Sequence, residues 1–302
     1  MRLPATQRSD TLTAGSPAIV WEECACLLCG STNLASLLEA SDPRAGDAGF
    51  RFLIAKCNRC GLCFTNPRPD LVSIKRFYPA DYHSYRAKPD GMNERIRKTD
   101  PIGKLLSVQG SARLLDFGCG AGDFLRRMHA LGWNVTGLDM AEPAVARIRD
   151  QYGLPAHVGT LPSPLWSGAC FEAITMWQSL EHVHQPLEVL RAAYRLLTTG
   201  GRLLVAAPNF DGFASRWFGA SWYGLDLPRH LTHFTPQTLR MMLGRAGFEC
   251  VEMQQQQRNS WIRHSAERHR NRFLQTRIGS GLAGWWGRLS GRAESILAIA
   301  VK

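Results

Sequence analysis

From residue 112 onward, short apolar runs alternate with longer segments whose apolar residues recur every three or four positions. The short runs are typical of buried strands, and the longer periodic segments are typical of helices. We expect strands at 113–117, 134–138, 156–158, 171–177 and 201–207, and helices at 123–131, 143–151 and 187–197. Strands and helices that alternate in this way predict a parallel sheet with helices on both faces, so the expected fold class is α/β and doubly wound.

Six of the nine cysteines lie between positions 24 and 63. Two Cys-x-x-Cys pairs, Cys26-Leu-Leu-Cys29-Gly30 and Cys57-Asn-Arg-Cys60-Gly61, are each closed by a glycine. Such a glycine permits the left-handed turn that lets backbone amides approach metal-bound thiolates. Four thiolates make a closed tetrahedral site, so the pairs predict a structural Zn²⁺ ion. Cys24 and Cys63 lie beside the pairs, and either could replace a ligand.

The net charge of +11 is unevenly distributed along the 302 residues. Residues 1–100 contain 14 basic and 11 acidic residues, residues 101–254 contain 13 and 12, and residues 255–302 contain 9 and 2. An RNA-binding domain more often has a basic body, so nucleic acid is not the expected partner.

Neither a membrane-spanning helix nor a signal peptide is expected. The chain has no run of 18 apolar residues, and residues 1–17 lack the apolar segment of a signal peptide. We therefore expect a cytoplasmic protein whose cysteines are reduced or bound to metal.

A glycine-rich turn follows the first strand of the α/β region. Asp116 lies near the end of that strand, and Gly118-Cys119-Gly120-Ala121-Gly122 comes directly after the strand. Ligands of such sheets bind at the carboxyl ends of the strands, where glycines let the backbone approach a cofactor. Asp139 ends the second strand, and its carboxylate suits the two hydroxyl donors of a ribose. The spacing departs from the dinucleotide pattern G-x-G-x-x-G, and an acid before the first glycine suits an amino group, so S-adenosylmethionine is favoured over a nicotinamide cofactor.

At these residues the chain resembles the class I S-adenosylmethionine-dependent methyltransferases. Leu114-Leu-Asp116-Phe-Gly118-Cys-Gly120-Ala-Gly122 resembles the first motif of the family, and Gly137-Leu-Asp139 resembles its second-strand acid. The cysteine pairs, Asn66-Pro-Arg-Pro69 and Leu225-Asp-Leu-Pro-Arg-His-Leu-Thr-His-Phe-Thr-Pro236 resemble a bacterial subfamily with an N-terminal zinc-binding region. The resemblance implies a Rossmann-like seven-stranded sheet and methyl transfer to a small molecule, with O-methylation favoured.

The resemblance also implies how the cofactor is held. The methionine part would lie against the glycine-rich turn, the ribose against Asp139 and the adenine against Met140. Gly159-Thr160-Leu161 lacks the acid that usually binds the adenine amino group, so that contact is either absent or made by the backbone. Trp177 and Gln178 would face the methyl group and the acceptor. The implied set is Asp116, Gly118, Cys119, Gly120, Gly122, Asp139, Met140, Thr160, Leu161, Trp177 and Gln178.

Methyl transfer is an in-line displacement, so the enzyme must mainly align the nucleophile and exclude water. A base helps where the acceptor has a high pKa. The candidates are Glu181, His182, His230 and His233, and each histidine could equally be a structural residue. Some quinone and RNA 2′-hydroxyl methyltransferases resemble this chain but hold a metal on a Glu-x-x-Glu-His cluster. Here Gln178 stands in place of the first Glu, which argues against a catalytic metal.

The C-terminal part contains a basic insertion. A helix is expected at 235–246 and a strand at 248–253, and the resemblance predicts a final antiparallel strand, which 295–301 fits. Residues 255–294 between the strands hold eight arginines, two glutamates and interleaved Trp, Phe and Leu. This composition fits a helix on a membrane surface, a lid or channel over an apolar acceptor, or a solvated or oligomeric helix.

Four regions are expected: a disordered tail at 1–20, a zinc ribbon at 21–70, a connector at 71–104 and a methyltransferase domain at 105–302. The aromatic segment Tyr78–Tyr85 either packs as a connector or lines the active site. One rival function is an RNA methyltransferase that grips RNA with the ribbon and the basic insertion. Another is a non-catalytic binding protein that keeps the fold, although the intact glycine-rich turn argues against it.

Overall fold

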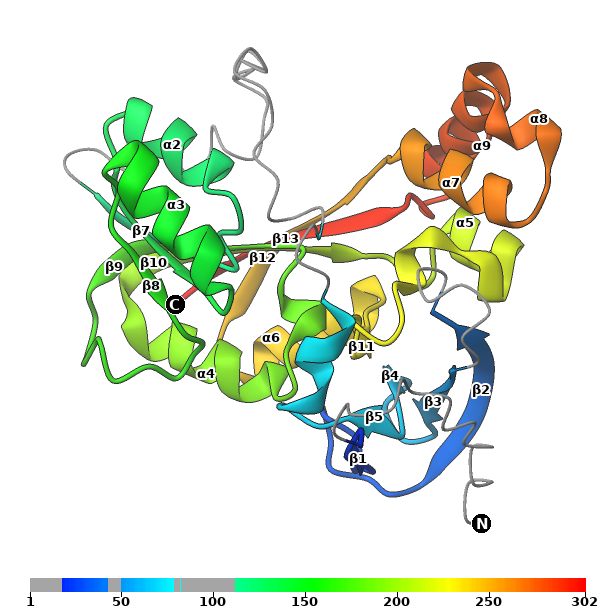
Figure 1. The fold of residues 1–302 in the computed structure, drawn as a ribbon, viewed down its shortest axis with the longest axis horizontal. Helices are drawn as coiled ribbons and strands as arrows, with labels where there is room; N and C mark the ends of the chain where they lie inside the picture. The colour runs from blue at the N-terminus through cyan, green and yellow to red at the C-terminus, as the bar shows by residue number, and fades with distance from the viewer. Residues whose placement is uncertain (1–17, 43–49, 79–81, 83–111) are drawn as a thin grey trace.

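The computed structural model describes residues 18–42, 50–78, 82 and 112–302, so most of the expected tail and connector lies outside the described residues. The main layer is a seven-stranded sheet in the order β12-β13-β10-β9-β6-β7-β8 (Figure 1). Its strands are Arg113–Phe117 (β6), Asn134–Asp139 (β7), Ala156–Val158 (β8), Phe171–Trp177 (β9), Leu197–Pro208 (β10), Glu249–Gln256 (β12) and Ser295–Val301 (β13). Neighbours from β8 to β10 are parallel, whereas β13 is antiparallel to β10 and β12. The expected α/β sheet is confirmed.

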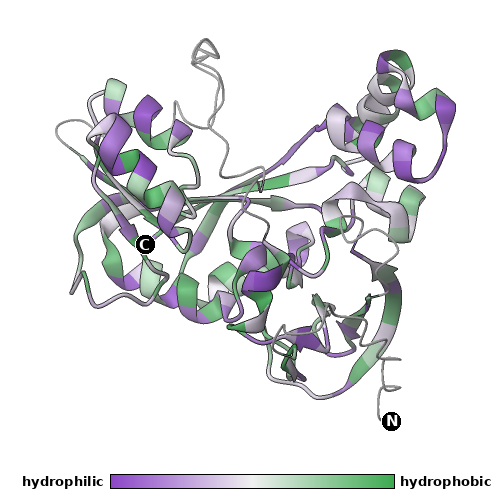
Figure 2. Ribbon diagram, viewed as in Figure 1, coloured by the Kyte–Doolittle hydropathy of each residue, from purple (hydrophilic) through white to green (hydrophobic). Residues whose placement is uncertain are grey.

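Helices cover both faces of this sheet. They are Asp123–Ala130 (α2), Glu142–Tyr152 (α3), Pro186–Leu196 (α4) and Pro236–Arg245 (α6). Helices α2 and α3 lie on one side of the sheet, and α4 and α6 lie on the other (Figure 1). In α4, Val189, Leu190 and Ala193 recur at helical spacing and are buried, whereas Glu188 and Arg191 face outward. Figure 2 shows that each of these helices carries both polar and apolar residues, as expected for helices half covered by a sheet.

Strand β10 starts earlier than the sequence pattern indicates. The pattern places its start at residue 201 and extends the preceding helix to 197, whereas the strand begins at Leu197. The register with β9 shifts between Leu197 and Arg202, which marks a bulge. Gly200 has a φ of 75°, a left-handed conformation that glycine adopts without strain. Gly200 and Gly201 therefore lie at an irregularity within β10.

The N-terminal residues 21–69, here called the ribbon region, build a second sheet in the order β11-β4-β3-β2. Its strands are Leu34–Ser41 (β2), Arg51–Cys57 (β3), Cys63–Thr65 (β4) and Thr232–His233 (β11), and Trp21–Glu22 (β1) pairs with Arg68–Pro69 (β5). Strand β11 comes from the chain between β10 and α6, and it pairs with β4. Backbone hydrogen bonds therefore join the ribbon region to the α/β part, a connection that the sequence does not predict.

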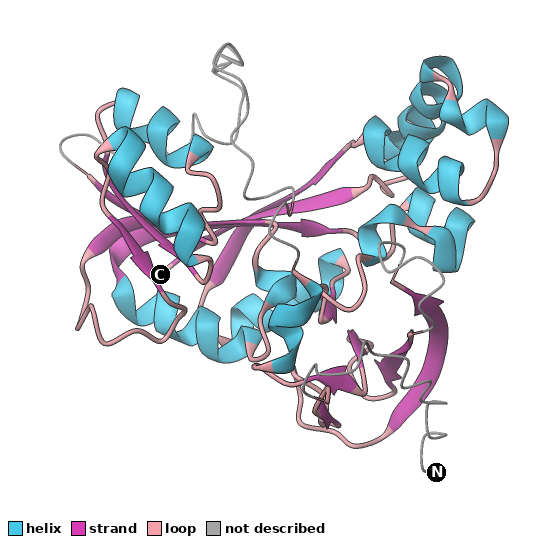
Figure 3. Cartoon of the chain, viewed as in Figure 1, coloured by secondary structure: helices cyan, strands magenta, loops and turns pink. Residues whose placement is uncertain are grey.

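The basic insertion folds into three helices between β12 and β13. They are Asn259–Arg268 (α7), Arg272–Gln275 (α8) and Arg277–Leu289 (α9). Helix α5 (Phe213–Phe218) packs against α7 and α9. Short 3-10 helices occupy Ser73–Phe77 (η1), Leu180–His182 (η3), Gly219–Ser221 (η4) and Tyr223–Leu225 (η5). Figure 3 shows α5 and α7 to α9 grouped at one end of β12 and β13. Within the described residues, no helix is long and apolar enough to cross a membrane.

Glu294, immediately before β13, is a fully buried carboxyl group. One of its oxygens accepts a hydrogen bond from the backbone N–H of Ala214 in α5 (3.2 Å), and the other has no partner among the described residues. Burial raises the pKa of this carboxyl from 4.5 to about 7. Because the folded protein holds the proton more tightly than the unfolded chain, the stability due to this proton is fully present below about pH 4.5 and is lost as the pH rises through 7.

Glu294→Gln should remove this loss, because the amide stays neutral at every pH. The free energy of unfolding of the variant minus that of wild type should therefore increase by about 3 kcal/mol from pH 4 to pH 8. Urea unfolding at the two pH values measures the change, with Glu188→Gln on the exposed face of α4 as the control. The same pH dependence in wild type and Glu294→Gln would contradict this assignment.

Candidate functional site

The glycine-rich turn joins β6 to α2 at the carboxyl end of the parallel strands. Gly118, Gly120 and Gly122 have φ values of 73°, 51° and 83°, which favour glycine. A Cβ atom on Gly118 would lie 2.5 Å from the Cβ of Ser179, and one on Gly122 would lie 2.7 Å from Cγ1 of Ile148. Glycine is thus required by the backbone conformation and by close neighbours, at the edge of the sheet where ligands of this fold bind.

Asp139, at the end of β7, lies against this turn. Its carboxylate accepts hydrogen bonds from the backbone N–H groups of Gly120 (2.9 Å) and Ala141 (2.8 Å). Burial raises the pKa of Asp139, and these N–H donors act in the opposite direction. Because a carboxylate has about four acceptor positions, this one can still accept hydrogen bonds from hydroxyl groups of a ligand.

Asp116, directly before the turn, is only 2% exposed. Oδ1 of Asp116 accepts a 2.7 Å hydrogen bond from Oγ1 of Thr175 in β9. Burial raises the pKa of Asp116 to about 7, and the charge of Asp139 adds to that effect. A cationic group bound beside it would favour the ionised carboxylate and lower this pKa.

The other residues of the expected cofactor set differ in how accessible their side chains are to a ligand. Met140 is 49% exposed, whereas the side chains of Cys119 and Leu161 are buried in the apolar core and leave only their backbone for a ligand. Trp177 packs against Phe124 of α2, with ring centroids 5.2 Å apart. The indole N–H of Trp177 is buried without a hydrogen-bond partner in the described part of the chain.

Gln178 and Thr160 complete that set. Gln178 has a φ of 51°, which is uncommon for a residue other than glycine. Its side-chain amide donates a hydrogen bond to Oγ of Ser295 in β13 (3.2 Å), so the amide points toward β13. Thr160 is half-buried in the loop after β8.

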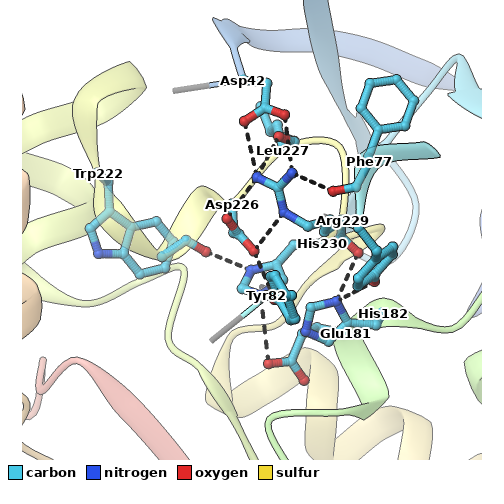
Figure 4. A network of polar contacts seen from close by, with 12 residues as sticks. Asp42, Phe77, Tyr82, Glu181, His182, Trp222, Asp226, Leu227, Arg229 and His230 are labelled. Carbon is cyan, nitrogen blue, oxygen red and sulfur yellow. Dashed lines mark hydrogen bonds and ion pairs between the residues drawn. The ribbon is translucent and has the colours of Figure 1, made fainter. Parts of the chain in front are cut away.

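Three candidate catalytic residues meet just beyond β9 (Figure 4). Glu181 and His182 lie in η3, and His230 lies two residues before β11. One donor atom from each residue lies within 4.8 Å of those of the other two. His230 Nε2 is 4.0 Å from Oε1 of Glu181, and the two imidazole rings are 4.6 Å apart. Both carboxylate oxygens of Glu181 are buried without a hydrogen-bond partner among the described residues.

Backbone carbonyls select the tautomers of the two clustered histidines. Nδ1 of His182 lies 3.0 Å from the carbonyl oxygen of Arg229, and Nδ1 of His230 lies 2.8 Å from that of Gly224. A carbonyl can only accept, so each Nδ1 donates and each Nε2 carries a lone pair. Burial lowers the pKa of His182 to about 3 and that of His230 to about 4, and it raises the pKa of Glu181 to about 8. The three groups are therefore largely uncharged near neutral pH.

His233, the fourth candidate, lies outside this cluster. Its Nε2 is 3.2 Å from Oγ1 of Thr65 in β4, and its ring packs against Phe210. Burial lowers the pKa of His233 to about 3. The His233 side chain therefore packs where β11 contacts the ribbon region, and not in the cluster of Glu181, His182 and His230.

Arg229 is a functional candidate that the sequence does not single out. It is 1% exposed and binds both carboxylate oxygens of Asp42, at the end of the ribbon region's β2, and both of Asp226, at 2.9–3.0 Å (Figure 4). It also donates to the carbonyl of Phe77 (2.9 Å). This network fixes the segment that carries His230. The only signal in the sequence is the density of charged residues in an otherwise apolar segment, and it does not point to Asp42, which is 187 positions away.

Two tyrosines of the aromatic segment lie over the cluster. Oη of Tyr78 is 2.9 Å from Nδ1 of His182, and Tyr82 donates to Oδ2 of Asp226 (3.1 Å). Their rings pack at 5.1 Å. These contacts support the alternative in which the segment lines the site, although residues 79–81 and 83–85 lie outside the described part of the chain.

The four cysteines expected to bind zinc come together in the ribbon region. Sγ of Cys26 lies 3.4 Å from that of Cys60, and Sγ of Cys29 lies 3.5 Å from that of Cys57. All four sulfur atoms lie within 4.8 Å of one another. A tetrahedral Zn²⁺ with bonds of about 2.3 Å needs sulfur atoms about 3.8 Å apart, so the four thiols fit the ion after a small adjustment.

The two Cys-x-x-Cys turns have the same local geometry. The N–H of Gly30 donates to the carbonyl of Cys26 (2.8 Å), and the N–H of Gly61 donates to that of Cys57 (2.9 Å). Both glycines have left-handed φ values, 71° and 78°. Cys24 and Cys63 are not part of the four-cysteine group.

Comparison with known proteins places the α/β part in a family. A family model described as a methyltransferase domain matches residues 84–253. A ubiquinone biosynthesis O-methyltransferase of Xanthomonas oryzae pv. oryzae (strain PXO99A) is 32% identical over 146 residues, which are 45% of this chain and 60% of that protein. The protein of the same name from Cupriavidus pinatubonensis is 27% identical over 207 residues, which are 63% and 82% of the two chains. The chain thus spans less than two thirds of the first of these relatives.

Solved structures share the fold. A chain of the Haloferax volcanii complex that contains the Trm112 methyltransferase activator matches with a TM-score of 0.51 and 18% identity, over 66% of this chain and 88% of that chain. A Bacillus halodurans chain matches with a TM-score of 0.50 and 18% identity, over 67% and 96%. At these identities the likeness shows the fold alone, and it agrees with the Rossmann-like sheet described above.

Proposed function

The chain belongs to the methyltransferase-domain family, and we propose that it transfers the methyl group of S-adenosylmethionine to a hydroxyl oxygen of a small molecule. One observation carries this proposal: the buried carboxyl group of Glu181, which has no hydrogen-bond partner among the described residues, lies two residues beyond Ser179, which packs against the glycine-rich turn. The relatives named for O-methylation in ubiquinone biosynthesis support oxygen as the accepting atom.

In this proposal the cofactor lies along the carboxyl ends of β6, β7 and β9. Asp139 accepts hydrogen bonds from the ribose hydroxyls while it continues to brace the turn. The exposed side chain of Met140 packs on the adenine. The positive amino group of the methionine part lies beside Asp116, where it keeps this buried carboxyl ionised.

The acceptor oxygen attacks the methyl carbon in line with the carbon–sulfur bond. As the oxygen–carbon bond forms, the carbon–sulfur bond breaks, its electron pair stays on sulfur, and S-adenosylhomocysteine leaves. The hydroxyl proton passes to the ionised carboxylate of Glu181, a form that becomes populated as the pH rises through its pKa of about 8. Nε2 of His182 and Nε2 of His230 accept hydrogen bonds and hold the acceptor beside that carboxylate.

The same three residues also fit a divalent cation. Two imidazoles and one carboxylate are a common donor set for such ions, and a backbone carbonyl orients each ring through Nδ1. Glu181, His182 and His230 would hold the ion, which would lower the pKa of a bound hydroxyl.

Glu181→Gln should lower kcat about 10²-fold and leave the affinity for S-adenosylmethionine unchanged, because the amide cannot take the proton. In wild type the rate should rise with pH through about 8, as Glu181 ionises, and the variant should lack this rise. Initial rates with the acceptor found by the labelling experiment below measure both effects, with Glu188→Gln as the control. An unchanged kcat would contradict the assignment.

Loss of wild-type activity on chelation, restored by added Mg²⁺ or Mn²⁺, would assign the three residues to a metal.

We also propose that the ribbon region binds one Zn²⁺ through Cys26, Cys29, Cys57 and Cys60. Four thiolates leave no open coordination position, so the ion has a structural role. The proposal keeps the domain boundaries expected from the sequence, with the ribbon at 21–70 and the methyltransferase domain at 105–302. The contacts of Arg229 with Asp42 then link the zinc-stabilised region to the catalytic cluster.

A further inference from the structure

Helix α9 turns its large apolar side chains away from the protein. Ile278, Leu282, Trp285, Trp286 and Leu289 recur every three or four residues and therefore form one stripe along the helix. All five are exposed, from 57% for Leu282 to 74% for Ile278. In an ordinary surface helix such a stripe faces the core.

The opposite side of α9 consists of small residues, and it is this side that packs on the protein. The buried residues are Gly279, Ser280, Ala283, Gly284 and Gly287. A Cβ atom on Gly287 would lie 3.0 Å from the carbonyl oxygen of Arg292 and 3.4 Å from Cβ of Phe213. A Cβ atom on Gly279 would clash with the carbonyl oxygen of Phe273. The close approach of α9 to its neighbours leaves no room for a large side chain, so the helix cannot turn its apolar stripe inward.

A neighbouring helix extends the apolar stripe. Trp217 of α5 is 55% exposed. Trp217 and Trp286 line a shallow depression between α5 and α9. The stripe and Trp217 together make one apolar surface, here called the α9 face.

The charges around the α9 face are mainly positive, and Asp211, an exposed acid near Trp217, is paired with Arg216. Arg272, Arg277, Arg288 and Arg292 are exposed, and none of them forms an ion pair with a described residue. The two acidic residues of the segment do not balance them, because Glu294 is buried and Glu267 lies on α7, 3.2 Å from His264.

We propose that the α9 face binds the surface of a lipid bilayer that contains anionic phospholipids. Amphipathic helices that lie on bilayers combine Trp, Phe and Leu on one face with arginine beside it. Tryptophan favours the membrane–water interface, and arginines gain from a negatively charged surface. This surface is independent of the proposed methyl transfer, and a protein that lacks that activity can still bind vesicles.

Two other occupants fit the α9 face less well. A second copy of the chain related by a twofold axis would bring the same unpaired arginines together, and like charges would oppose the contact. A lid over the acceptor would need the apolar stripe to face the cluster of Glu181, His182 and His230, whereas the stripe lies on the side of α9 opposite its contacts with the rest of the protein.

Vesicle co-sedimentation tests the proposal, with equal parts phosphatidylglycerol and phosphatidylcholine compared with phosphatidylcholine alone. The full chain should bind the anionic vesicles at least tenfold more tightly than the neutral ones. Trp285→Ser with Trp286→Ser, and separately Arg277→Gln with Arg288→Gln, should each weaken binding at least tenfold. Leu165→Ser is the control, because Leu165 is an exposed apolar residue in the loop between β8 and β9. All of these side chains are exposed, so thermal melting should show that each variant folds.

Three results would overturn the proposal. The first is wild-type protein that does not bind anionic vesicles, and the second is equal binding by wild type and both double variants. The third is a dimer, measured by light scattering, that the tryptophan substitutions dissociate while vesicle binding is absent; this result would assign the α9 face to a second copy.

Discussion

Replacing Asp139 with alanine should weaken the binding of S-adenosylmethionine by about two to four orders of magnitude. The carboxylate braces the glycine-rich turn through the N–H of Gly120, and it also accepts a hydrogen bond from the N–H of Ala141. Two hydrogen bonds from ribose hydroxyls to a charged acceptor contribute about 1.5–3 kcal/mol each. Their loss therefore costs about 3–6 kcal/mol, which is a factor of about 10² to 10⁴ in Kd.

Isothermal titration with S-adenosylmethionine and with S-adenosylhomocysteine measures this effect. Glu142→Ala, three residues further on in the first turn of α3, is the matched control and should bind as wild type does. Asp139→Asn should lie between wild type and alanine, because it keeps one acceptor oxygen but loses the charge. Unchanged affinity in a folded Asp139→Ala protein would remove the ribose assignment.

Cys57→Ser should lose about one Zn²⁺ per chain and unfold the ribbon region. Cys57 contributes one of the four clustered sulfur atoms, and a serine hydroxyl does not replace a thiolate as a zinc ligand. Structural zinc contributes about 10–16 kcal/mol in isolated zinc-binding peptides, far more than a small sheet can replace. Because Asp42 of the ribbon region binds Arg229, the loss should also lower methyl transfer.

Elemental analysis and limited proteolysis measure the two parts of this prediction. Cys63→Ser is the matched control, because Cys63 is buried nearby but lies outside the group. It should keep its zinc. A full equivalent of zinc in Cys57→Ser, or zinc loss in Cys63→Ser, would contradict the ligand set.

Local patterns predicted the parts of the structure that local physics determines. The central strands, the glycine-rich turn and the four-cysteine group follow from short apolar runs, fixed spacings and the conformational needs of glycine. Strand β11 and the pairing of Arg229 with Asp42 were missed. They join positions more than 160 residues apart, and nothing in the sequence near Asp42 distinguishes this buried acid from acids that lie on the surface.

Helix α9 shows a second kind of feature that sequence patterns do not predict. Its apolar stripe and its small-residue stripe are both present in the sequence, and hydrophobicity alone would place the tryptophans inside. The structure reverses this order because backbone atoms of Phe273 and Arg292 lie too close to Gly279 and Gly287 to leave room for a tryptophan there. Composition therefore identified an amphipathic insertion, and only packing showed which of its faces is free.

Methyl transfer itself is the central claim, and isotope labelling tests it most directly. The purified protein is incubated with S-adenosylmethionine labelled with ¹³C in the methyl group, together with a bacterial metabolite extract or with total RNA. We predict that the label appears as an O-methyl carbon of a small molecule, in an amount equal to the S-adenosylhomocysteine released. Label in RNA, label on nitrogen or carbon, or no S-adenosylhomocysteine from protein that binds the cofactor would contradict the account.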